Sequence, residues 1–180
     1  MTPGREITSL DNLSNLTFVG GELRISAFSL SNFSGFDALT TVTGNLTIEN
    51  VDTATELMGF DQLTQVDGIL RFNTSQTATR LSGFNGLTSV GGLDLGAYFR
   101  LTEIAGLSNL TTIDGDLWIT RNNDLTTLSG LSQITEVSGQ LLILENDSLP
   151  QCEAEAFRDG LTTLGGDVSI EENLGTGTCG

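Results

Sequence analysis

Short segments in which apolar and polar residues alternate recur at regular intervals along the chain. In the line ALTTVTGNLTI, the apolar Leu46 and Ile48 alternate with the polar Asn45 and Thr47. Alternation with a period of two is typical of a β-strand that buries one face. Copies of this line begin at Asn15, Ala38, Gln62, Gly86, Asn109, Gln133 and Gly160. The sequence therefore predicts one such strand in every copy of a repeat.

A column of threonines sets the repeat length. Its members are Thr17, Thr40, Thr64, Thr88, Thr111, Thr135 and Thr162. Their spacings are 23, 24, 24, 23, 24 and 27 residues, and the sequence between the strands shows no helical segment of ten or more residues. We therefore expect each repeat to coil once and stack on the previous one, with equivalent residues ~4.8 Å apart. This predicts a mainly β fold, a parallel β-helix or solenoid of about seven coils, in one domain over residues 1–180.

The apolar pair of each strand is expected to point into a continuous core. These pairs are Leu23/Ile25, Leu46/Ile48, Leu70/Phe72, Leu93/Leu95, Leu117/Ile119, Leu141/Ile143 and Val168/Ile170. A glycine before each strand marks a corner that needs either a positive φ or close packing. The line GLTSVGGLDL, from Gly86 to Leu95, is one residue shorter than its neighbours.

The last repeat is longer and carries helix signals. Pro150 and the acidic Glu153 favour a helix start, and Gly160 favours its end. The end of a solenoid core needs a polar cover, so residues 149–180 are predicted to form a C-terminal cap with a short helix.

The only two cysteines, Cys152 and Cys179, are 27 residues apart, close to one repeat. Neighbouring coils would then bring them together as a disulfide, which points to an oxidising compartment. The alternative is a pair of reduced thiols.

The units NLTTIDGDLWI and GLSNLTTI resemble the receptor L-domain repeat, over roughly residues 13–173. That repeat occurs in the ectodomains of the insulin and epidermal-growth-factor receptors, in fungal cell-wall proteins and in bacterial surface proteins. The resemblance implies a right-handed β-helix related to leucine-rich repeats, usually extracellular. The run from Cys152 to Cys179 is most similar to the bacterial surface members. Because the chain has no cysteine-rich module or kinase, hormone binding and signalling are not implied.

Charge and composition narrow the function classes. Seven basic residues, all arginines, stand against 23 acidic ones, giving a net charge of −16, and histidine is absent. Such a chain is unsuited to nucleic acid or to anionic membranes. Without histidine or lysine, no catalytic constellation, metal site or cofactor is predicted, and we expect no enzyme. The carboxylate pairs Asp114/Asp116 and Glu171/Glu172 are explained equally well by a solvated acidic surface.

The outward side chains of the strands offer a candidate binding patch. Its members are Trp118, Leu142, Leu144, Arg71 and Thr120. A tryptophan beside two leucines on a polar face is typical of a contact surface, although a loop or a second chain covering it would give the same pattern. The sequence thus predicts a non-catalytic recognition or adhesion module at the cell surface, secreted, with a protein or glycan partner and no membrane insertion.

The threonine column supports an alternative function. Regularly spaced hydroxyls on a flat face can order water, so an ice-binding solenoid is the second hypothesis. Phe18, Gln65, Ser89 and Glu136 interrupt the neighbouring rank of threonines. In the structural interpretation, each hydroxyl instead satisfies backbone groups at a corner.

Overall fold

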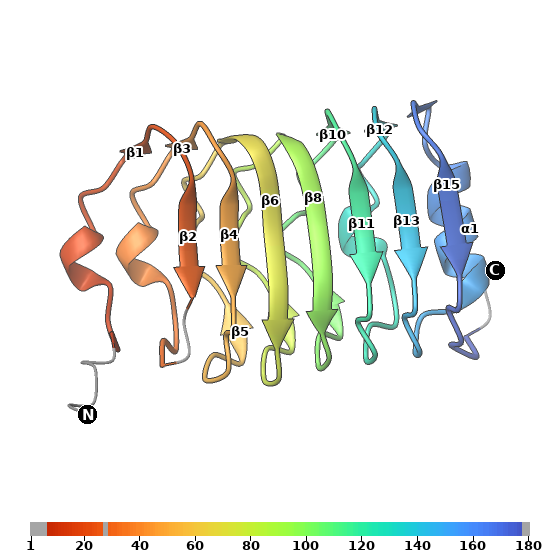
Figure 1. The fold of residues 1–180 in the computed structure, drawn as a ribbon, viewed down its shortest axis with the longest axis horizontal. Coiled ribbons are helices and arrows are strands. Elements are labelled where there is room, and N and C mark those ends of the chain that lie inside the picture. Colours follow the sequence, from red (N-terminus) through yellow and green to blue (C-terminus); the bar gives the residue numbers. More distant parts are fainter. Residues whose placement is uncertain (1–6, 27–28, 178–180) are drawn as a thin grey trace.

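Parallel strands stacked along one long axis dominate the structure (Figure 1). The computed structural model describes residues 7–26 and 29–177, which form a mainly β, parallel β-solenoid of about six turns. The predicted mainly β, parallel solenoid is therefore confirmed, with about six turns where the sequence predicted about seven coils. Among the described residues, no helix is long and apolar enough to cross a membrane.

One strand from each coil joins a long sheet on one side of the molecule. Its strands are β2 (Leu23–Ser26), β4 (Leu46–Glu49), β6 (Gln65–Ser75), β8 (Ser89–Tyr98), β11 (Leu117–Thr120), β13 (Leu141–Leu144) and β15 (Val168–Glu171). All pair in parallel, and Leu117 lies between Leu93 and Leu141 of the adjacent coils. The coils therefore stack in the register that the repeat predicts.

The remaining elements are short. Two-residue strands of the same sheet, which has twelve strands in the described part of the chain, precede five of its longer strands: β1 (Phe18–Val19), β3 (Thr41–Val42), β10 (Thr112–Ile113), β12 (Glu136–Val137) and β14 (Thr163–Leu164). A second sheet contains β5 (Glu56–Leu57), β7 (Arg80–Leu81) and β9 (Glu103–Ile104). Single turns of 3-10 helix are η1 (Asp11–Leu13), η2 (Ser34–Phe36) and η3 (Ser129–Leu131), and the α-helix is α1 (Gln151–Asp159).

Equivalent apolar side chains form ladders through the core. Phe60 stacks on Phe36 and on Phe84, with ring centroids 5.2 and 4.8 Å apart and nearly parallel planes. The predicted inward pairs are buried in the middle coils, but Leu23 and Ile170 are only half-buried and Val168 is 41% exposed. The end coils differ because each has a neighbour on one side only.

The corner glycines are required by close packing. A Cβ placed on Gly44 would lie 2.6 Å from the backbone of Gly21, and one on Gly166 would lie 2.7 Å from the backbone of Gly139. Such distances are inside van der Waals contact, so a side chain would push the coils apart. At Gly44 and Gly166, close packing of the coils therefore requires glycine, and a positive φ does not.

Left-handed backbone instead occurs at or just after the C-terminal ends of the strands, at residues other than glycine. These are Asn50, Thr74, Ala97, Arg121, Glu145 and Glu172, with φ between 55° and 61°. This conformation costs an L-residue roughly 1–2 kcal/mol, and it is least favourable for a β-branched residue such as Thr74. All six residues are exposed or half-buried. Arg121 pairs with Glu145 at 2.7 Å, and this ion pair lowers the pKa of the Glu145 carboxyl.

A ladder of buried asparagines follows this column in the C-terminal coils. Asn122, Asn146 and Asn173 are at most 5% exposed. The Asn146 amide donates to the Ile119 carbonyl at 3.0 Å and to Asn173 Oδ1 at 2.9 Å, and its Oδ1 accepts from the Asn122 backbone N–H. These side chains satisfy backbone groups that the turn would otherwise leave unpaired in the core.

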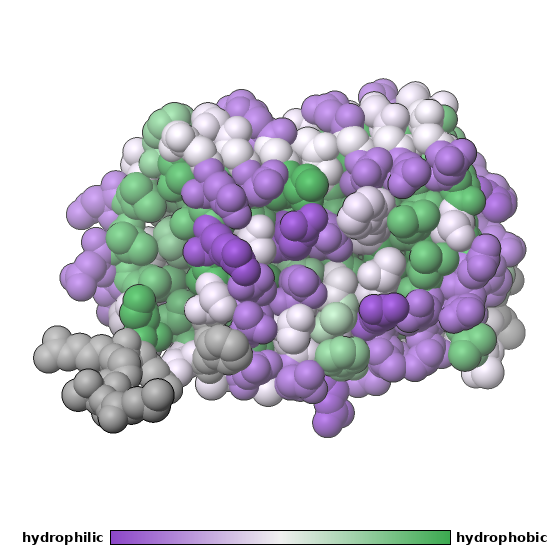
Figure 2. Space-filling view, in the orientation of Figure 1, coloured by the Kyte–Doolittle hydropathy of each residue, from purple (hydrophilic) through white to green (hydrophobic). Residues whose placement is uncertain are grey.

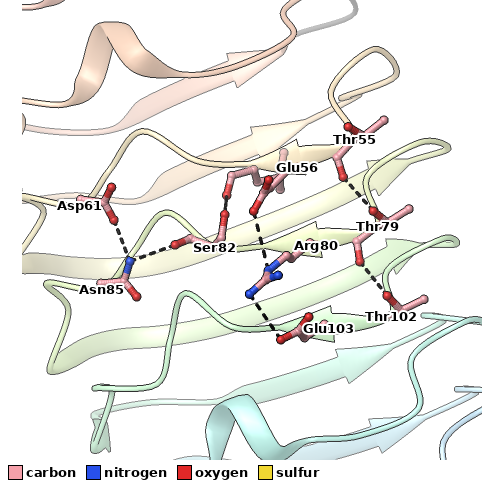
Figure 3. A network of polar contacts seen from close by, with 10 residues as sticks. Thr55, Glu56, Asp61, Thr79, Arg80, Ser82, Asn85, Thr102 and Glu103 are labelled. Carbon is pink, nitrogen blue, oxygen red and sulfur yellow. Dashed lines mark hydrogen bonds and ion pairs between the residues drawn. The ribbon is translucent and has the colours of Figure 1, made fainter.

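Polar ladders run along the second sheet as well (Figure 3). The Thr102 hydroxyl donates to the Thr79 carbonyl at 3.0 Å, and the Thr79 hydroxyl to the Thr55 carbonyl at 3.1 Å. Arg80 lies between Glu56 and Glu103, at 3.7 and 3.6 Å. Stacking thus brings together opposite charges from three successive coils.

The predicted C-terminal helix is present as α1, in the part of the coil where η1, η2 and η3 lie in other coils. Gln151 ties it to the last strand by donating to the Ile170 carbonyl at 2.9 Å. Val168 on β15 stays 41% exposed, so the described residues do not fully cover this end of the stack. The role of residues 149–180 as a cap stays a prediction.

Thr74→Asn should stabilise the protein by about 1 kcal/mol, because asparagine tolerates the left-handed region better than threonine. Asn50 already occupies the equivalent position one coil earlier, with φ 55°. The free energy of unfolding in urea measures the change. Thr43→Asn, at an exposed residue without positive φ, is the matched control and should change stability by less than ~0.5 kcal/mol. No gain at Thr74 would refute the strain argument.

Asn146→Ala should destabilise the protein by about 3 kcal/mol or more, because it removes the buried partners of the Asn122 N–H and of Asn173 Oδ1. Asn109→Ala is the control, since that exposed amide makes one bond, to the Asn85 carbonyl. Equal losses from the two variants, measured by urea unfolding, would show that the ladder adds nothing special.

Candidate functional site

The strand register gathers the predicted patch on the exposed face of the long sheet. Arg71 lies opposite Asp94, Asp94 opposite Trp118, and Trp118 opposite Leu142, across β6, β8, β11 and β13. Thr120 and Leu144 are opposite each other in a parallel row on the same face. All five predicted residues are half-buried and belong to one surface.

This surface is mixed in character. Figure 2 shows hydrophobic surface gathered over β13, whose outward residues are Leu142 and Leu144. Hydrophilic surface covers the sheet toward β2, where Arg24 pairs with Glu49 at 2.8 Å. Trp118 lies at the boundary between the two regions, because its register partners are Asp94 on one side and Leu142 on the other.

A hollow of about 190 Å³ opens beside Trp118 on this face. It is lined by Ile69, Arg71, Gly91, Gly92, Leu93, Asp94, Gly115, Asp116 and Trp118. Gly92 pairs with Ile69 in register and has no side chain of its own, so the surface is recessed at this coil. The recess falls in the repeat that is one residue short, where the β6–β8 pairing shifts register between Val66 and Ile69.

Paired charges form part of the wall. Arg71 Nε and Asp94 Oδ2 are 2.7 Å apart, and these side chains are 35% and 18% exposed. Asp116 Oδ1 accepts a hydrogen bond from the Gln140 backbone N–H at 2.8 Å, which fixes that carboxylate at the opposite edge. The hollow therefore presents hydrogen-bond donors and acceptors whose positions are set by neighbouring coils.

Trp118 is the single tryptophan of the chain, and its indole Nε1 is buried without an acceptor among the described residues. A buried donor without a partner costs roughly 1–3 kcal/mol. In native proteins such groups are few and often mark functional sites. The ring is therefore held by packing rather than by a hydrogen bond of its own.

The predicted patch includes Trp118 and Arg71 of the hollow. Asp116 was expected only as part of a solvated carboxylate pair. Ile69 and Gly92, which stand with Asp116 two residues before the outward row, were not predicted to take part. The signal was present in the shortened line with Gly91 and Gly92. The sequence alone did not show that the missing residue would leave a recess next to Trp118.

The threonine column is tied into the backbone. Hydroxyls of Thr40, Thr64 and Thr111 donate to the carbonyl of the threonine one coil earlier, at 2.8, 3.2 and 3.1 Å. The Thr162 hydroxyl does the same with Thr135 at 3.0 Å. These bonds favour the structural interpretation of the column. Beside it, Phe18 is 56% exposed and breaks the flatness of the face.

Two further predictions concern cysteine and metal. Cys152 is half-buried in α1, while Cys179 lies outside the described residues, so the proposed disulfide stays a prediction. Within residues 7–26 and 29–177, no group of histidine, cysteine or acidic side chains is arranged to hold a metal ion.

Comparisons with protein-family models, with curated proteins and with solved structures gave no match. The solenoid repeat fold rests on the structure itself, and the finer resemblance to receptor L-domain repeats rests on the sequence pattern alone.

The ice-binding alternative is tested by thermal hysteresis. Because the threonine hydroxyls already donate to backbone carbonyls, we expect the protein to leave ice growth unchanged at millimolar concentration. Hysteresis that disappears in Thr111→Tyr would contradict this expectation and make the threonine column a functional face. The same substitution at Thr102, in the ladder of the second sheet, is the control.

Proposed function

We propose that this chain is a non-catalytic recognition module that binds its partner on the exposed face of the long sheet. The observation that carries the proposal is the hollow beside Trp118, flanked by the Arg71–Asp94 pair and continued by the apolar residues of β13. Tryptophan and arginine are enriched among residues that dominate binding energies. Strands paired on both sides present these groups with little freedom to lose on binding.

The partner is a protein or glycan met outside the cell, at a cell surface. The resemblance of the repeat to receptor L-domains and bacterial surface proteins supports this location, as does the spacing of Cys152 and Cys179. The net charge of −16 disfavours nucleic acid and anionic lipid as partners. The proposal needs no cofactor.

Leu142 and Leu144 extend the site beyond the hollow. Both are half-buried on β13, in register with Trp118 and Thr120. A partner that covers Trp118 and reaches these leucines would bury a continuous apolar strip surrounded by polar groups, which is the usual anatomy of a recognition surface.

Labelled protein can be titrated onto cells whose surface proteins or surface glycans have been removed, by protease or by periodate oxidation. The double variant Leu142→Ser/Leu144→Ser should bind untreated cells at least tenfold more weakly, because the apolar strip is lost. Phe18→Ser removes an exposed apolar side chain from another face and should stay within twofold of the wild type. Equal binding by the double variant, with its fold intact by circular dichroism, would refute the proposed face.

A further inference from the structure

We infer that the hollow beside Trp118 binds one uncharged pyranose ring, the terminal or branching residue of a glycan. This inference rests on the proposed function and narrows it to a ligand class. Four features of the hollow support it: the size, the charges of the wall, the tryptophan ring and the floor made by glycine.

Size limits the ligand first. The hollow measures about 190 Å³, below the ~300–1,000 Å³ typical of pockets for drug-sized molecules. A single six-membered ring with its substituents fits such a volume, whereas a longer chain would have to continue over the open sheet face. The site therefore recognises one residue of a larger ligand.

The charges in the wall select against ions. Arg71 stands within 2.7 Å of Asp94, so an ammonium or guanidinium group that approaches Asp94 meets the positive charge of Arg71 beside it. Asp116, at the opposite edge, is bonded to the Gln140 backbone N–H instead of to a cation. An anionic ligand meets Asp94 and Asp116, on a chain whose net charge is −16. A neutral ligand with hydroxyls avoids both penalties.

Neighbouring hydroxyls match the polar groups that remain. The Arg71 guanidinium donates only, and the Asp94 and Asp116 carboxylates accept only. A sugar hydroxyl does both, so two adjacent hydroxyls can accept from Arg71 and donate to Asp94 in the same arrangement. Charge-assisted hydrogen bonds of this kind are the stronger ones available to an uncharged ligand.

Trp118 supplies the apolar part of the site. One face of a pyranose ring carries C–H groups, and an indole face offers a rigid apolar surface against which they can pack. The indole N–H has no acceptor among residues 7–26 and 29–177. A small rotation of the ring that lets this N–H donate to a ligand oxygen would remove the cost of leaving it buried and unpaired.

Glycine keeps the floor of the hollow open. A Cβ on Gly92 would lie 3.3 Å from Ile69 Cγ1 and 3.4 Å from the Asp116 carbonyl, so alanine fits with slight adjustment but occupies ligand space. Gly160, at the end of α1, is outside the lining, and a Cβ there meets its nearest neighbour, the Phe157 carbonyl, at 3.4 Å. The two glycines thus provide a test variant and a matched control.

The test uses Trp118 fluorescence, which has no competing tryptophan in the chain. Methyl glycosides of glucose, galactose, mannose and N-acetylglucosamine are titrated to about 100 mM, with choline and glucuronate as the cationic and anionic probes. At least one neutral glycoside should shift the emission with a Kd in the millimolar range, as about a dozen non-hydrogen atoms permit.

The variants locate the binding. Gly92→Ala should weaken it at least fivefold, and Gly160→Ala should leave it within twofold. In Trp118→Phe, whose binding is followed by calorimetry, an aromatic ring stays in place but it is smaller and the indole N–H is lost. This variant should bind at least threefold more weakly while unfolding at the same or a higher urea concentration. Loss of stability together with binding would instead make Trp118 a structural residue.

Three results would overturn the inference: no response to any neutral glycoside, tighter binding of choline or glucuronate, or binding that Gly92→Ala leaves unchanged. None of these bears on whether the leucine double variant loses cell binding. If the double variant fails on cells and no glycoside binds, the recognition face stands and its ligand is a protein. If the double variant binds cells normally, the face itself is wrong.

Discussion

The structure depends on one constraint, which is that successive coils stack in register at the spacing of a parallel β-sheet. Each side chain therefore has its own equivalent above and below it. Phenylalanines stack on phenylalanines in the core, and buried asparagines bond to asparagines at the turns. The same constraint forces glycine at the corners, where the backbone of Gly44 approaches that of Gly21 too closely for a side chain.

The candidate site arises where this regularity is broken. The coil that contains Gly91 and Gly92 is one residue short, and its pairing with β6 slips locally. The neighbouring coils keep their length, so Ile69 and Trp118 stand on either side of a recess. Ladder bonds on both sides hold those walls, which means that the site is built without a mobile loop. A rigid site on paired strands suits recognition, because little conformational freedom remains to be lost on binding.

Much of the fold could be predicted from the repeat, because its apolar pairs and corner glycines recur at equivalent positions. The left-handed column could not, since Asn50, Thr74 and Arg121 share a backbone conformation but no side-chain chemistry. The asparagine ladder was visible as Asn122 and Asn146, two positions after the strands, but periodicity alone does not separate a buried amide from a solvated one. At the site, alternation identified the outward residues. The hollow depends on a difference between adjacent coils, and a repeat pattern averages such differences away.

Shortening one coil by a single residue has changed the surface locally while the pairing of Leu117 with Leu93 and Leu141 continues undisturbed. In most folds a deletion inside a buried strand would reverse the sides of all later residues. Here the missing residue falls at a corner, so the next coil keeps its register. In such an architecture an insertion or deletion changes the surface of one coil, so a new binding specificity can evolve there while the other coils preserve the fold.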